Sequence, residues 1–149
     1  MSRSMDTLPT ESDINVYDSL DERAAVDRFL GKSLGEVEDR CQAGFALDVT
    51  HDLYWIGPRA FIYYVRAVVN YLKSDSSQDD PDAVNGFAGM VEFRFDELET
   101  DLKTACSVFV EAIDHVLQNY DKFAIDSGLY GDLRPRYVAL RDRIRPMMS

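Results

Sequence analysis

Two groups of histidine and carboxylate residues have the spacing that places side chains on one face of a helix. Glu111 and His115 are four residues apart with Asp114 between them, a set able to reach one metal ion. A di-iron helical site would need Glu-x-x-His in two copies, but the residue three after Glu111 is Asp114 and no second copy exists. We therefore interpret the group as a solvated helix face, and we predict no metal site and no cofactor.

The second group is Asp48, His51 and Asp52, just ahead of the most aromatic segment of the chain. Carboxylates beside a histidine are able to exchange protons with a substrate or hold a polar ligand. The same residue types also cap helices and line polar surfaces, which is the interpretation that we favour. A small enzyme or ligand-binding protein with its site at these residues and the aromatic helix remains the alternative hypothesis.

Nucleophilic and phosphate-binding chemistry find little support in the sequence. Cys106 and His115 are nine residues apart on one predicted helix, so they point to opposite faces. Gly31-Lys32-Ser33 resembles the end of a P-loop, but Val26 stands where that motif needs its first glycine. We predict no catalytic residue.

The segment from Asp52 to Lys73 contains the only tryptophan of the chain and is the most informative stretch. Gly57-Pro58 marks a helix start, because a proline at the first helical position sacrifices no hydrogen bond. Helical spacing then predicts one buried stripe, which consists of Phe61, Tyr64, Val65, Val68 and Leu72.

The opposite side of this helix is predicted to face solvent. Tyr63 would lie there between Arg59 and Arg66, with Trp55 at the helix entrance. Trp, Tyr and Arg carry much of the binding energy at protein interfaces. We therefore predict a partner-binding face, formed by Trp55, Arg59, Tyr63 and Arg66.

Further helices are expected on both sides of this segment. Ser19 with Glu22 and Ser33 with Glu36 have the spacing of capping boxes. The predicted helices cover about residues 19–30, 33–42, 58–74, 81–95, 100–122 and 135–145. A flexible N-terminal tail of residues 1–12 would precede a single all-α domain, a bundle of about six helices over residues 13–149.

One of these helices has a competing interpretation. Residues 91–95 alternate between apolar and polar side chains, as a strand does, and Gly86 and Gly89 weaken a helix. A longer stripe at helical spacing favours the helix, but the sequence leaves both alternatives open.

The chain is strongly acidic, with a formal net charge of −11. This charge opposes binding to nucleic acid, and no apolar run is long enough for a membrane span. Because no signal-peptide core is visible either, we expect a cytoplasmic location. Residues 134–149 differ, since five arginines and one acid give them a charge of +4. We predict that this segment packs on the acidic body, with an anion-binding strip as the alternative.

Three sequence blocks resemble a group of small uncharacterised bacterial proteins. The blocks are Phe29-Leu-Gly-Lys-Ser, the segment from Asp52 to Tyr64 with its Pro58-x-Ala60-Phe61-x-Tyr63-Tyr64 pattern, and Asn119-Tyr-Asp-Lys-Phe. The resemblance extends over residues 28–123 in scattered blocks. It implies a bacterial cytosolic origin and a helical fold, and no activity, cofactor or catalytic residue.

Taken together, these features indicate a non-enzymatic, acidic protein-interaction module of the bacterial cytosol, with an adaptor or immunity-like role. Its partner would be another protein, and a basic one would suit the charge. Association with a second copy of the chain is also open.

Overall fold

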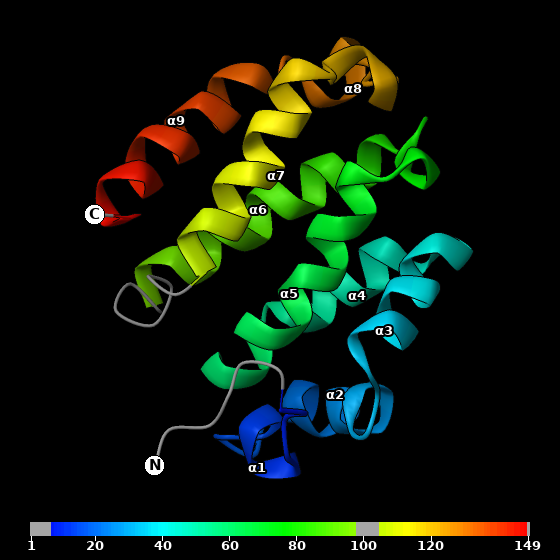
Figure 1. The fold of residues 1–149 in the computed structure, drawn as a ribbon, viewed down its shortest axis with the longest axis vertical. Coiled ribbons are helices and arrows are strands. Elements are labelled where there is room, and N and C mark those ends of the chain that lie inside the picture. Colours follow the sequence, from blue (N-terminus) through cyan, green and yellow to red (C-terminus); the bar gives the residue numbers. More distant parts are fainter. Residues whose placement is uncertain (1–6, 98–104, 149) are drawn as a thin grey trace.

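Helices form all of the regular secondary structure in the computed structural model, which describes residues 7–97 and 105–148 (Figure 1). They are α1 (Glu11–Ile14), α2 (Leu20–Phe29), α3 (Leu34–Arg40), α4 (Ala46–Leu53), α5 (Pro58–Lys73), α6 (Pro81–Glu97), α7 (Cys106–Gln118), α8 (Ser127–Tyr130) and α9 (Arg134–Ile144). Single helical turns cover Cys41–Phe45, Asp75–Ser77, Tyr120–Phe123 and Arg145–Met148. The predicted all-α class is confirmed. None of the helices in the described part is long and apolar enough to cross a membrane.

Two of the first helices begin at the predicted capping boxes. In α2 the Glu22 amide donates to Ser19 Oγ over 3.1 Å, and the Ser19 amide donates back to the Glu22 carboxylate over 3.0 Å. Ser33 and Glu36 make the same exchange at the start of α3. Each box satisfies amide groups that have no partner within the helix.

A third capping box was not predicted. Thr10 and Asp13 exchange hydrogen bonds and start α1 at Glu11, so helix begins inside the segment predicted as a flexible tail. Residues 1–6 of that segment lie outside the described residues.

The described part contains more helices than the six that we expected. Gly44 has a φ of 104°, which interrupts the helical path after α3 and lets α4 start separately at Ala46. The short helix α8 lies between two of the predicted helices, and α7 ends at Gln118 rather than near Lys122. The predicted start of α7 near Thr100, with Leu102, lies outside the described residues.

Helix α5 is central and packs against α1, α3, α4 and α7 (Figure 1). Its predicted stripe, from Phe61 to Leu72, is confirmed, because each of the five side chains is completely buried. Helices therefore surround α5 on several sides instead of lining up as a regular bundle.

Helix α6 continues to Glu97, which settles residues 91–95 as helical. Its two inner glycines face α4. A Cβ atom at Gly86 would lie 2.9 Å from a methyl carbon of Leu47, and one at Gly89 would lie 2.8 Å from the Tyr54 hydroxyl. The glycines thus allow close packing of α4 on α6, which offsets their low helix propensity.

The basic C-terminal helix α9 packs against α6 and α7, as predicted. All five of its arginine side chains, counting Arg145 just after its end, pair with carboxylates of the body or of the preceding turn. The pairs are Arg134–Asp132, Arg136–Glu92, Arg141–Asp114, Arg143–Asp96 and Arg145–Asp114. This pairing favours the structural role of the segment over an anion-binding strip.

Candidate functional site

The predicted partner-binding face does not form one exposed surface. Tyr63 is only 5% exposed and packs edge-on against Tyr64, with 4.8 Å between ring centroids. The Arg66 guanidinium lies 4.9 Å from the centroid of the Tyr63 ring, and the half-buried Arg59 donates to the Thr7 carbonyl over 2.8 Å. The predicted exposure of Tyr63 is therefore wrong. Neighbouring helices cover the central helix α5 on more than one side. The apolar stripe in the sequence identifies only its most apolar side, so the burial of the other sides does not follow from the stripe.

Trp55 lies on the surface, apart from these residues, in the turn between α4 and α5. Its ring meets Phe93 of α6 edge-on at 5.6 Å between centroids, and Tyr54 lies 5.2 Å from the same Phe93 ring. The His51 ring is 6.2 Å from Tyr54, and Leu47 is one helical turn before His51 on the same side of α4. We call these five residues, Leu47, His51, Tyr54, Trp55 and Phe93, the Trp55 patch.

Buried groups on α6 and α5 fix the position of this patch. Arg94 is 2% exposed, and its guanidinium donates to the Tyr54 carbonyl over 2.9 Å, which satisfies an acceptor at the end of α4. The guanidinium also lies 4.7 Å from the centroid of the Phe61 ring. The turn that carries Tyr54 and Trp55 is thereby tied to the core, next to Phe93.

The apolar side chains of the Trp55 patch remain open to solvent. Leu47 is 50% exposed, Phe93 46% and Trp55 40%. A single exposed apolar residue is ordinary on a protein surface, but neighbouring ones that contact each other are typical of an interaction site. The sequence did contain a signal for Phe93, because this residue lies off the buried stripe of α6.

The residues of the alternative enzymatic or ligand-binding site lie together in a polar depression of about 280 Å³. It is lined by Asp48, His51 and Asp52 of α4 and by two arginines, Arg28 and Arg40. Asp52, however, is 5% exposed and accepts two hydrogen bonds from Arg28, of 2.5 and 2.6 Å. Both carboxylate oxygens of Asp52 are thus occupied by the link between α2 and α4, which favours the structural interpretation.

The candidate metal ligands on α7 face separate partners. The partners of Glu111, Asp114 and His115 are Lys73, Arg141 and Lys122, respectively. Within residues 7–97 and 105–148, no three His, Cys, Asp or Glu side chains gather as a metal site requires.

The other candidates for chemistry also have structural roles. Cys41 and Cys106 are buried, and burial raises the pKa of the Cys41 thiol to about 12, so it stays protonated. Ser33 caps α3, and the chain before Gly31 is the helix α2 rather than the strand that a P-loop requires.

His115 takes part in a compact set of contacts at the end of α5. The Lys122 ammonium lies 3.0 Å from the carbonyl oxygens of Leu72 and Ser74 and 2.8 Å from His115 Nε2. Its three N–H donors match these three acceptors, so His115 must be neutral to accept one of them. Burial lowers the pKa of His115, and the nearby charges of Lys122 and Lys73 lower it further.

These contacts predict an acid-sensitive contribution to stability. His115 in the unfolded chain takes up a proton near its ordinary pKa of 6.5, whereas the folded protein resists protonation until a lower pH. The unfolded state therefore binds more protons as the pH falls below 6.5, and the free energy of unfolding decreases. We expect His115→Gln to weaken this pH dependence, measured by urea unfolding between about pH 7.5 and pH 5.5.

The matched control is His51→Gln, which removes the exposed histidine of α4. Both variants are unfolded at the same pH values, and the difference between them reports the contribution of the contact between Lys122 and His115. An unchanged pH dependence in His115→Gln would contradict the role given to His115.

The chain matches no family model, no curated protein and no solved structure.

Proposed function

We propose that this chain is a non-enzymatic protein-interaction module, with an adaptor or immunity-like role in the bacterial cytosol. The observation that carries the proposal is the Trp55 patch, where aromatic side chains in mutual contact stay open to solvent. Large aromatic side chains bury much apolar area with little loss of rotamer freedom, which makes them frequent anchors of binding energy.

The charge of the chain favours a basic partner over a second copy. At −11, two copies repel each other at long range, whereas a positively charged protein is attracted. Asp48 and Arg28 line the polar depression that shares His51 with the Trp55 patch, so charged side chains border the patch. An apolar centre with a charged rim is the usual organisation of a protein interface.

The enzymatic alternative has less support among the described residues. The candidate general base Asp52 is held by Arg28, and the Cys41 thiol is kept protonated by burial. A catalytic or ligand-binding site in the polar depression near His51 is the alternative hypothesis.

A capture experiment tests the proposal. The tagged full-length chain should retain one stoichiometric partner from lysate of its host, and that partner should carry a basic surface. Phe93→Ser should weaken the affinity about 30-fold or more, because loss of an aromatic anchor costs about 2 kcal/mol or more. Higher salt should weaken it further.

The control is Leu129→Ser, which removes an equally apolar side chain that is 72% exposed on α8, outside the Trp55 patch. This variant should bind as the wild type does. Recovery of no stoichiometric partner, or equal capture by Phe93→Ser, would count against the proposal.

A further inference from the structure

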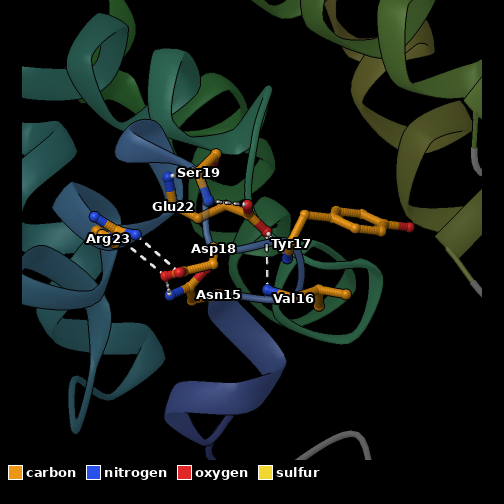
Figure 2. A network of polar contacts seen from close by, with 7 residues as sticks. All are labelled: Asn15, Val16, Tyr17, Asp18, Ser19, Glu22 and Arg23. Atoms are coloured by element: carbon orange, nitrogen blue, oxygen red, sulfur yellow. Dashed lines mark hydrogen bonds and ion pairs between the residues drawn. The ribbon is translucent and has the colours of Figure 1, made fainter.

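The turn between α1 and α2, together with the first residue of α2, presents the two most exposed large apolar side chains of the described residues. Leu20 is 79% exposed and Tyr17 is 78% exposed, and Val16 beside them is 46% exposed. Figure 2 shows the Tyr17 ring pointing away from the polar groups that hold its backbone. None of these residues belongs to the Trp55 patch, which carries the proposed function.

One buried carboxylate holds the backbone of this segment. Glu22 is 2% exposed and accepts hydrogen bonds from the amides of Val16, Tyr17 and Ser19, at 2.8, 3.0 and 3.0 Å (Figure 2). Burial alone would raise the pKa of Glu22, but the hydrogen bonds outweigh it and the pKa is lowered. The carboxylate is therefore ionised, and from the first turn of α2 it holds three backbone amides of the segment.

An ion pair between Asp18 and Arg23 fixes the middle of the segment. Asp18 has a φ of 59°, in the left-handed region that residues other than glycine seldom adopt. Its carboxylate accepts two hydrogen bonds from Arg23, each of 2.8 Å, and one of 3.3 Å from Asn15 (Figure 2). These contacts offset the unfavourable backbone geometry.

A segment held in this way is preorganised for binding. Exposed side chains on a mobile loop lose conformational entropy when a partner binds, whereas those on a fixed backbone lose less. The Val16–Leu20 segment thus presents solvent-exposed apolar side chains on a backbone that is already fixed in one conformation.

The negative charge around the segment favours a partner with a basic surface. Residues 11–28 contain six acids and two arginines, a net charge of −4, and the acids Asp18 and Asp21 lie next in sequence to Tyr17 and Leu20. A second copy would bring the same negative charge to the contact and be repelled. We propose that the Val16–Leu20 segment is a second docking element, which places Tyr17 and Leu20 in an apolar pocket with a Lys- or Arg-rich rim on another protein.

Photocrosslinking tests this proposal in the full-length chain. Tyr17 is replaced by p-benzoylphenylalanine in the host cell, and the irradiated products are identified by mass spectrometry. We expect a product with one other protein, crosslinked at a surface rich in Lys and Arg. Asp21→Lys should reduce its yield about fivefold or more, because it reverses the charge beside the contact.

Two controls separate this surface from the Trp55 patch. The same photoreactive residue at Leu129 should not give the product, and a Phe93→Ser background should retain it. A product yield no higher than that from position 129, a product made of two copies of this chain, or loss of the product in the Phe93→Ser background would each overturn the proposal.

Discussion

Phe61→Ala is expected to lower the free energy of unfolding by about 3–5 kcal/mol, the largest effect that we predict for a single substitution. The Phe61 ring lies in the first turn of α5, is completely buried and is 6.1 Å from the Phe109 ring of α7. Its removal leaves a cavity and also takes away the aromatic face beside the buried Arg94 guanidinium. Urea unfolding of the purified variant measures the change.

Phe93→Ala is the matched control, because the same side chain is removed from a position that is 46% exposed. Its cost should stay within about 1 kcal/mol. A reversed order of the two costs would mean that the inner and outer sides of these helices are assigned incorrectly.

Gly57→Ala is expected to destabilise the protein by about 1–3 kcal/mol, although the backbone at this position suits any residue. Gly57 has φ and ψ of −60° and 161°, and its amide donates to the Ile14 carbonyl over 3.0 Å. An added Cβ would lie 2.2 Å from the Asp13 carbonyl oxygen and 2.5 Å from a methyl group of Val16. Because the first of these atoms is backbone, α1 would have to move away from the start of α5.

Gly35→Ala is the control for this substitution. Gly35 lies in α3, and the nearest atom that its Cβ would meet is Ser33 Oγ at 3.9 Å. Alanine there should stabilise the protein by about 0.5–1 kcal/mol, because it restricts the unfolded chain. Thermal or urea unfolding compares the two variants, and a Gly57→Ala protein as stable as the wild type would contradict the close contact with α1.

The features predicted correctly from the sequence depend on short-range patterns. Ser19 with Glu22 and Ser33 with Glu36 specify helix starts because the partners are only three residues apart. The buried stripe of α5 follows from helical spacing alone. In contrast, the start of α4 as a separate helix depends on the backbone conformation of Gly44. The presence of glycine at positions 86 and 89 is explained only by the packing of α4 on α6.

The candidate site was predicted only in part, for a related reason. Trp55 was expected at a surface and is found there. The burial of Tyr63 depends on how many helices surround α5, which no local pattern encodes. Phe93 is 38 residues from Trp55 in the sequence, in a segment that could be read as helix or strand, so their contact was not predicted.

The occupancy of the Trp55 patch can be measured directly, because Trp55 is the only tryptophan of the chain. Incorporation of 5-fluorotryptophan gives one ¹⁹F signal, which is observable in the presence of host lysate. We predict that added lysate shifts or broadens this signal in the wild type, and that the effect is lost in Phe93→Ser. A signal that lysate leaves unchanged, or that changes equally when only the concentration of the purified chain is raised, would contradict a docking surface for another protein at Trp55.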